Sequence, residues 1–352
     1  MESGPRVAKE PWLAVNLSLV LPGLGQFYAR AWGQGLFFLL GWAALGTGII
    51  WAIFCPHGNM VLALPLGAAF LTLIAVNLWS AHRCARRANS PDAEAARKQF
   101  KDPFLAVFLT RFLPGVGHLY MKKWIIGIAL MAVALGVAVG LHSFLALHLV
   151  VLSVYGAAVS LWAWRCGPGE RRGGVFVIAV LVGLIAGVGL FNVGSALVFR
   201  QYAAEAFRIP TASMAPTIEA EDRILVLKVA SYVPRRGDLV VFLNPMDRTQ
   251  KHVKRVAAQE GETVECKEDG IYVNGVKLSE GPWGRFPHVA IARQEYATEG
   301  DPLTVPPGHI FVLGDNTQKS FDSRFFGPVP LSDIKGRAYK RYWPLGRAGP
   351  IE

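Results

Sequence analysis

The chain has 352 residues, of which 52% are apolar and only 17% are charged, and its formal net charge is +11. A soluble enzyme of this size usually has about 25% charged residues, so the composition excludes disorder, collagen and a disulfide-rich scaffold and argues against a purely soluble protein. Residues 1–199 hold 15 Lys and Arg against 6 Asp and Glu, whereas residues 200–352 hold 21 against 19. The basic half is also the apolar half, which points away from nucleic acid and toward a membrane.

The N-terminal half is predicted to cross a membrane five times, since about 20 apolar residues suffice to span the hydrocarbon. Five apolar runs follow one another: Gly35–Phe54, Met60–Ser80, Ile125–Leu141, Phe144–Trp164 and Gly174–Phe199. Two shorter runs, Trp12–Leu21 and Phe104–Leu113, are expected to be interfacial or half-buried. Residues 1–12 do not resemble a cleaved signal peptide, because no apolar core with a small-residue cleavage site follows cleanly.

An eight-residue motif occurs twice in this half. Leu-Pro-Gly-Leu-Gly-Gln-Phe-Tyr at residues 21–28 recurs as Leu-Pro-Gly-Val-Gly-His-Leu-Tyr at residues 113–120, each before an apolar hairpin. A tight turn at the membrane face, with glycine at positive φ, is the simpler interpretation; a ligand or partner site is the alternative. We divide the chain into residues 1–87 and 104–172 (two hairpin repeats), 88–103 (a cytoplasmic linker), 173–199 (an anchor span) and 200–352 (an extracytoplasmic β domain).

The loop charges predict the orientation. The segment 82–123 carries nine Lys or Arg and the segment 165–172 carries three, whereas the hairpin tips Cys55–Asn59 and His142–Ser143 carry none. Because positive loops stay in the cytoplasm, the tips and everything after Phe199 are predicted to lie outside it. An odd number of spans from a cytoplasmic N-terminus gives the same answer.

The polar half is predicted to be a mainly antiparallel β domain. Its short apolar or β-branched runs are Ile224–Leu227, Leu239–Phe242, Thr263–Cys266, Ile271–Val273 and His309–Leu313. Asn274-Gly275 after the fourth run is a strong hairpin signal. The four cysteines (Cys55, Cys84, Cys166 and Cys266) form no C-x-x-C pair and have no histidine cluster nearby, so neither a metal nor a redox site is expected.

Four segments of this half carry candidate chemistry: Ile209–Thr217, Arg235–Phe242, Lys251–Val256 and Gly314–Arg324. Two prolines make the first a rigid loop that could hold the hydroxyl of Ser213 still. In the third, alternation puts Lys254 on the face opposite Arg255, and Lys254 points inward if the Arg255 face is wet. Taken singly, each segment has a plain structural interpretation, because most loop serines form turns and most lysines are solvated.

Taken in this order, the four segments resemble the boxes of type I signal peptidase (leader peptidase) over roughly residues 207–344. The Ser-x-Met-x-Pro-Thr, Arg-Gly-Asp-Val-Val-Phe-type, Lys-Arg-Val and Gly-Asp-Asn…Ser-x-Asp-Ser-Arg patterns are all present. Two positions depart from the family. Ala212 stands where glycine is usual, and Glu262 carries a longer carboxylate than the usual aspartate. The family usually has one or two spans, so the resemblance says nothing of the repeated hairpins.

The resemblance implies a Ser/Lys mechanism without a cofactor or metal. Ser213 takes the place of the nucleophile and Lys254 that of the general base, whose pKa would be lowered by burial. The Ser213 N–H and the Thr211 hydroxyl would stabilise the oxyanion. Ser320 would orient the lysine amine, and Asp322 with Arg324 would form a supporting ion pair.

The implied function is removal of N-terminal signal peptides from exported preproteins after Ala-x-Ala-like sites, at the bacterial cytoplasmic (inner) membrane. Preproteins, the phospholipid bilayer and the export machinery are the expected partners, and nucleic acid is not one. Two alternatives stay open: a Ser/Lys protease with a narrower, dedicated substrate, and a catalytically inactive membrane scaffold. The presence of both Ser213 and Lys254 argues against the second.

Overall fold

The computed structural model describes residues 8–140, 145–168, 175–202, 204–228, 232–285, 290–291 and 293–351. The chain forms two compact units. The first, here called the helical unit, comprises Met1–Ile49 and Leu64–Leu197. The second, here called the β unit, comprises Ile50–Ala63 and Val198–Glu352. The tip of the first hairpin therefore belongs to the same unit as the β-sheets.

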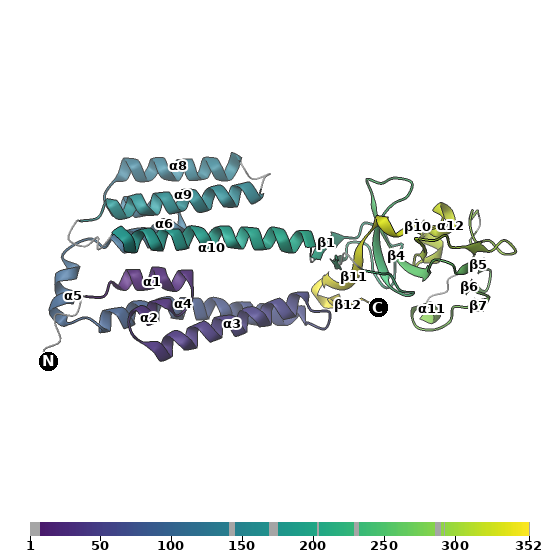
Figure 1. The fold of residues 1–352 in the computed structure, drawn as a ribbon, viewed down its shortest axis with the longest axis horizontal. Helices are drawn as coiled ribbons and strands as arrows, with labels where there is room; N and C mark the ends of the chain where they lie inside the picture. Colours follow the sequence, from purple (N-terminus) through teal and green to yellow (C-terminus); the bar gives the residue numbers. More distant parts are fainter. Residues whose placement is uncertain are drawn as a thin grey trace. The chain divides into compact units, whose positions relative to one another are not determined.

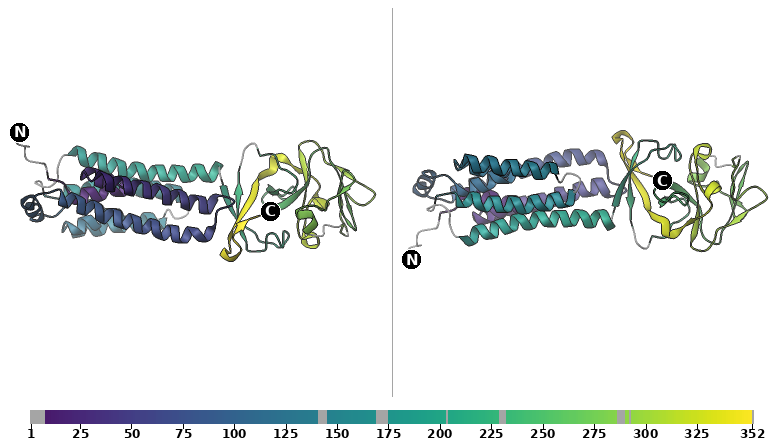
Figure 2. Two further views of the ribbon diagram at one scale, coloured as in Figure 1. Left: turned by 90° about the horizontal axis from the view of Figure 1, so that it is seen from below. Right: turned by 90° about the horizontal axis from the view of Figure 1, so that it is seen from above.

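The N-terminal part of the chain is helical, and its long helices run alongside one another (Figures 1 and 2). The helices are α1 (Pro11–Val20), α2 (Leu24–Tyr28), α3 (Trp32–Phe54), η1 (Met60–Leu62), α4 (Ala63–Arg87), α5 (Pro91–Lys98), α6 (Pro103–Phe112), α7 (Val116–Tyr120), α8 (Trp124–Gly140), α9 (Leu145–Arg165) and α10 (Val175–Tyr202). Each of the five predicted apolar runs corresponds to one long helix.

Within the described residues, three helical stretches are long and apolar enough to cross a membrane: Trp32–Phe54, Met60–Arg87 and Val175–Ser195. The apolar stretches Trp124–Val139 and Leu149–Arg165 of α8 and α9 are shorter. Several apolar helices are thus confirmed, and the count of five spans stays a prediction. The predicted tip His142–Ser143 and residues 169–172 of the predicted cytoplasmic loop lie outside the described residues.

Three short helices lie outside the long apolar runs, and one of them, α5, lies within the predicted linker. Helices α1 and α6 match the two predicted half-buried runs, and they pack together around Leu13, Phe104 and Val107. Helix α5 was not predicted, although its sequence has the usual end signals. The Ser90 hydroxyl accepts a hydrogen bond from the Ala93 N–H (3.3 Å) and caps the helix. Acidic residues in the first turn and basic residues in the last turn interact favourably with the helix dipole.

The two copies of the motif fold alike. Gly23 and Gly115 open the turns at φ 94° and 104°, as the repeat predicted. A β-carbon on either would meet the backbone oxygen of Gly35 or Gly127 at 2.2 or 2.3 Å, so only glycine fits. The Tyr28 hydroxyl accepts from the Glu10 N–H, and the Tyr120 hydroxyl accepts from the Asp102 N–H, both at 3.0 Å.

The described strands of the β unit form two antiparallel sheets, so the predicted antiparallel β domain is confirmed. One has the strand order β1-β2-β11-β3-β4-β9-β10 with β12 paired to β11, and the other has the order β7-β6-β5-β8. The strands are β1 (Ala204–Arg208), β2 (Arg223–Leu227), β3 (Leu239–Leu243), β4 (Lys251–Ala258), β5 (Thr263–Lys267), β6 (Gly270–Val273), β7 (Val276–Lys277), β8 (Leu303–Thr304), β9 (His309–Leu313), β10 (Val329–Pro330), β11 (Ile334–Trp343) and β12 (Gly349–Pro350). Asn274 and Gly275, at φ 51° and 77°, make the predicted hairpin between β6 and β7.

Strand β11 joins the first-hairpin tip to the sheet within the β unit. The buried Lys340 donates through Nζ to the carbonyl oxygens of Ala52 (2.8 Å) and Cys55 (2.9 Å). The Tyr339 hydroxyl donates to the carbonyl of Phe54 at 3.0 Å. These carbonyls lie at the C-terminal end of α3, where helical partners are missing and a cation is favoured. Lys340 and Tyr339 therefore cap α3.

Candidate active site

The loop after β1 holds Ser213 between two parts of the β unit. On one side, the buried Met214 and Ile218 pack into a core with Ile224 and Val241. On the other side, the Asn316 N–H donates to the carbonyl of Ser213 (3.1 Å), and the Asn316 side chain donates to the carbonyl of Ala212 (3.1 Å). Contacts on both sides fix the backbone that carries the serine hydroxyl.

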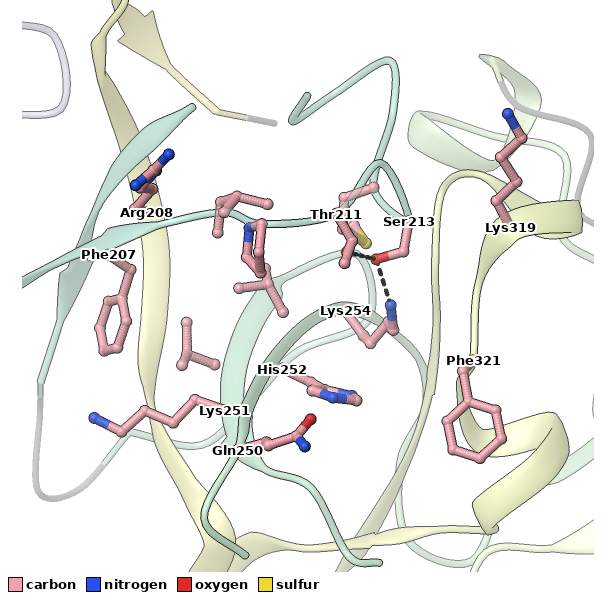
Figure 3. Close-up of a pocket in the computed structure, with 15 residues that line it drawn as sticks. Phe207, Arg208, Thr211, Ser213, Gln250, Lys251, His252, Lys254, Lys319 and Phe321 are labelled. Carbon is pink, nitrogen blue, oxygen red and sulfur yellow. Dashed lines mark hydrogen bonds between the residues drawn. The ribbon is translucent and has the colours of Figure 1, made fainter. Parts of the chain in front are cut away.

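Lys254 reaches Ser213 from the middle of β4. Its backbone pairs with Val240 of β3, and its side chain is only 3% exposed. Its Nζ lies 2.7 Å from the Oγ of Ser213, and the Thr211 hydroxyl lies 3.4 Å from the same oxygen (Figure 3). The structure thus brings three of the predicted site residues together.

Burial lowers the pKa of Lys254 from its usual value to about 8. Removal from water disfavours the charged ammonium form. The nearby Arg324 also lowers the pKa, whereas Asp322 and Asp315 oppose the effect of burial. A buried lysine with a lowered pKa next to a serine hydroxyl can act as a general base near neutral pH.

The other face of β4 is not wet, so the condition under which alternation would point Lys254 inward is not met. Lys254 is buried all the same. Arg255 is fully buried, and its Nε and Nη2 donate to the two oxygens of Asp315 at 2.8 and 2.7 Å. The Thr217 hydroxyl donates to Asp315 at 2.6 Å. Asp315 therefore links the serine loop to the lysine strand. The sequence showed this residue only as part of a motif, because a buried pair 60 residues apart leaves no local pattern.

The loop 314–324 contains the other predicted site residues. Asp322 and Arg324 form a buried ion pair at 2.8 Å, and Asp322 also accepts from the Gly314 N–H at 3.0 Å. The Oγ of Ser320 is buried and has no hydrogen-bond partner within the described part of the chain. The structure therefore does not join Ser320 to Lys254 by a hydrogen bond, and its role in orienting the amine stays a prediction.

The two departures from the family pattern are accommodated. The φ angle of Ala212 is not positive, so this position does not require a glycine. Glu262 accepts from the Gln259 N–H (2.8 Å) and pairs with Arg236. Its longer carboxylate therefore closes the turn after β4 and ties it to the loop before β3.

A pocket of about 420 Å³ opens beside the Ser213 and Lys254 pair (Figure 3). Its walls are largely apolar, and basic side chains join them: its lining includes Phe207, Ile209, Pro210, Met214, Val241, Val253 and Phe321, together with Arg208, Lys251 and Lys319. His252 also faces it. Among the described residues, no group of three His, Cys, Asp or Glu could hold a metal ion. The arrangement suits attack by a serine hydroxyl on an acyl group held in an apolar cleft.

Comparison with known proteins gives the family. Residues 181–343, from α10 to β11, match the family model described as "Signal peptidase, peptidase S26". Signal peptidase I of Bacillus caldolyticus is 35% identical over 189 residues, which cover 50% of this chain and 93% of that protein. This chain belongs to the type I signal peptidase family. Members of this family are serine endopeptidases that remove signal peptides from exported proteins.

Two further relatives each match less than half of the chain. Thylakoidal processing peptidase 1 of Arabidopsis thaliana is 34% identical over 160 residues, and this chain spans 44% of its length. A crystal structure of a signal peptidase I from Enterococcus faecalis is 36% identical, covers 30% of this chain and 97% of its own, and has a TM-score of 0.24. The family match begins within α10, so the two hairpin repeats lie outside it.

Proposed function

We propose that this chain is a membrane-bound signal peptidase in which Ser213 is the nucleophile and Lys254 the general base. The observation that carries the proposal is the 2.7 Å contact between the Ser213 Oγ and a buried Lys254 Nζ. A serine hydroxyl is a poor nucleophile by itself and needs an adjacent base. With its pKa lowered to about 8, Lys254 has a useful neutral fraction at neutral pH.

In the first step, neutral Lys254 takes the hydroxyl proton as the Ser213 Oγ attacks the carbonyl carbon of the scissile peptide bond. The Ser213 N–H and the Thr211 hydroxyl donate to the oxyanion, a role supported by the position of Thr211 beside the serine. Lys254 then protonates the leaving amine, which leaves an ester on Ser213. Water deprotonated by Lys254 hydrolyses this ester and restores the dyad.

The substrate is a preprotein with small side chains before the cleavage site, in an Ala-x-Ala-like pattern. The apolar pocket beside Ser213 supports this assignment, because it can take up small apolar side chains of an extended segment. The bilayer and the protein-export machinery are the other expected partners. The mechanism needs neither a cofactor nor a metal.

The chain spans the bacterial inner membrane five times, with the β unit on the outer side. The positive residues of segments 82–123 and 165–172 support this orientation. Independent support comes from the uncharged tip of the first hairpin, since Lys340 and Tyr339 bond to its carbonyls. A tip that shares a compact unit with the β-sheets lies on the same side of the membrane as they do.

Of the two alternatives, an inactive scaffold is disfavoured by the intact contact between Ser213 and Lys254. The deciding experiment is cleavage of a purified preprotein by the full-length protein in detergent. We expect wild type to release the mature protein and Ser213→Ala to release none. Equal cleavage by both would refute the assignment of Ser213. If wild type cleaves only one of several preproteins, the narrower protease is the better description.

A further inference from the structure

The two hairpin repeats differ in how their polar groups are satisfied. In the first, the Gln26 side chain donates to the backbone and side-chain oxygens of Asn77 (3.0 and 3.1 Å), and the Gly23 N–H donates to the Asn77 side chain (3.2 Å). Asn77 comes from α4 and is fully buried. An amide network therefore closes the turn of the first repeat.

The second repeat lacks this network. His118 occupies the position of Gln26, is fully buried, and has no partner for either ring nitrogen among the described residues. Ser160 stands where the first repeat has Asn77, since each precedes a Leu-Trp pair. The Ser160 hydroxyl is shorter and donates to its own helix, at the Gly156 carbonyl (2.7 Å). Among the described residues, no side chain bonds to this turn as Asn77 bonds to the first.

A pocket of about 260 Å³ lies at this place within the helical unit. Its polar lining is Thr110, Arg111, Ser153 and Ser160, and its apolar lining includes Phe112, Leu152 and Ile185. The Nη1 of Arg111 is buried and has no hydrogen-bond partner within the described ranges. The corresponding residue of the first repeat is Leu19, 92 positions earlier, so the cation is particular to the second copy.

Within the described residues, no carboxylate pairs with Arg111. The hydroxyls of Thr110 and Ser153 donate to the carbonyls of Ala106 and Leu149, both at 2.8 Å, as that of Ser160 does to Gly156. The sequence contains no Asp or Glu in residues 103–169 or 171–204. Arg111 is half-buried, and leaving its buried Nη1 without a partner is costly. An unpaired cation on an apolar helix of a membrane protein points to a functional site.

We propose that this pocket binds the phosphodiester group of an anionic phospholipid through Arg111. The guanidinium fork matches two phosphate oxygens, which gives a strong charge-assisted pair. Only a headgroup with a net negative charge also offsets the positive charge of Arg111, since the ammonium of a zwitterionic headgroup already pairs with its phosphate. The apolar residues beside it, among them Phe112 with 71% of its surface exposed, can contact acyl chains. A free phosphate would satisfy Arg111 but would leave these apolar walls without an occupant. The chemistry therefore favours a lipid.

The test uses the full-length protein, delipidated in detergent, with phosphatidylglycerol, phosphatidylcholine or inorganic phosphate added. Native mass spectrometry counts the retained lipid, and a thermal unfolding scan measures stabilisation. We expect retention and a raised Tm with phosphatidylglycerol only. Arg111→Leu and Ser160→Asn, which install the residues of the first repeat, should weaken retention about tenfold. Arg165→Leu, on an exposed arginine at the end of α9, is the matched control and should behave as wild type.

The outcomes separate clearly. Equal retention of both lipids by wild type would overturn the proposal, and so would full phosphatidylglycerol selectivity in Ser160→Asn and Arg111→Leu. Stabilisation by inorganic phosphate alone would identify an anion site and refute the lipid. Because Ser160→Asn keeps the arginine, it tests the pocket even where loss of Arg111 impairs folding.

Discussion

Lys254 sets the expected pH dependence of cleavage. Because only its neutral form accepts the serine proton, kcat/KM should rise about tenfold per pH unit below the pKa and level off above it. The midpoint of this rise in kcat/KM should lie near pH 8, the value to which burial lowers the pKa of Lys254. The measurement is a pH series of preprotein cleavage in detergent. A midpoint near pH 10 instead would show that the lysine is not buried in the working enzyme.

The same shift predicts a pH-dependent stability. The folded-state pKa of Lys254 (about 8) lies below the value of about 10.4 for a lysine in an unfolded chain. Between these values the unfolded chain binds more protons, so this group makes the folded state more stable as pH rises from about 8 to 10. Chemical unfolding of Lys254→Met, which lacks the titrating group, provides the comparison.

Two substitutions of Lys254 test whether its amine acts as the general base. Lys254→Arg should abolish cleavage, because a guanidinium stays protonated at neutral pH. Lys254→His should also be inactive, since the shorter side chain does not reach the Ser213 Oγ. Lys277→Arg, on the exposed hairpin between β6 and β7, is the matched control. Near-wild-type cleavage by Lys254→Arg would rule out its role as the base.

Asp315 tests the buried link between the serine loop and β4. Asp315→Asn leaves the guanidinium of Arg255 buried without its counter-charge, and we expect a loss of about 3–5 kcal/mol in the free energy of unfolding. Asp269→Asn, which removes an exposed pair with Lys277, should cost no more than about 1 kcal/mol. Denaturant titration of both variants measures the difference, and equal losses would contradict a structural role for the buried pair.

The sequence predicted part of this site. The positions of Ser213 and Lys254 followed from short motifs with fixed spacing, which need no knowledge of the fold. The partners of Asp315 and Arg255 could not be predicted, since the two residues meet only when loop 314–324 folds back onto β4. For the same reason, the alternation along β4 could not show that both of its faces are buried.

At the scale of helices and strands, the glycine turns of the two repeats can be tested by substitution. Gly115→Ala forces a side chain into the left-handed region, with a β-carbon 2.3 Å from the carbonyl of Gly127, and should cost about 1–3 kcal/mol. Gly136→Ala in α8 meets nothing within 4 Å and serves as the control. Thermal unfolding in detergent compares the two, and a Tm equal to that of wild type for Gly115→Ala would contradict the close approach.

Apolar periodicity and turn residues predicted the five long helices, the short helices α1 and α6, strands β2, β3, β5, β6 and β9, and the hairpin at Asn274-Gly275. Strand β11 was missed because its sequence, Ile-Lys-Gly-Arg-Ala-Tyr-Lys-Arg-Tyr-Trp, is rich in charge and its register shifts at bulges. Its pairing with β2 and β3, far away in the sequence, stabilises it. A local sequence pattern therefore predicts a strand well when the strand has an apolar face. It predicts a strand poorly when the strand is stabilised mainly by pairing with distant strands.

For the whole molecule, the proposed topology makes a labelling prediction. In a chain whose native cysteines are otherwise alanine, Cys84 should react with a membrane-impermeant thiol reagent only after sealed cells are permeabilised. A cysteine introduced by Lys277→Cys on the exposed β6–β7 hairpin should react in intact cells. Native Cys266 is unsuitable because it is fully buried. Labelling of Cys84 in sealed cells would invert the orientation and place Ser213 on the cytoplasmic side.

The place of β11 in its sheet bears on how the enzyme is made. This strand lies between β2 and β3, although about 100 residues separate it from either along the chain. Until synthesis has passed Trp343, β2 and β3 have no common neighbour, and the end of α3 lacks its Lys340 cap. In the proposed topology, Ser213 and Lys254 therefore come together only after the polypeptide has been translated and translocated past Trp343. Under that proposal, each new copy of the enzyme depends on the export route before it can cleave the other proteins that use the route.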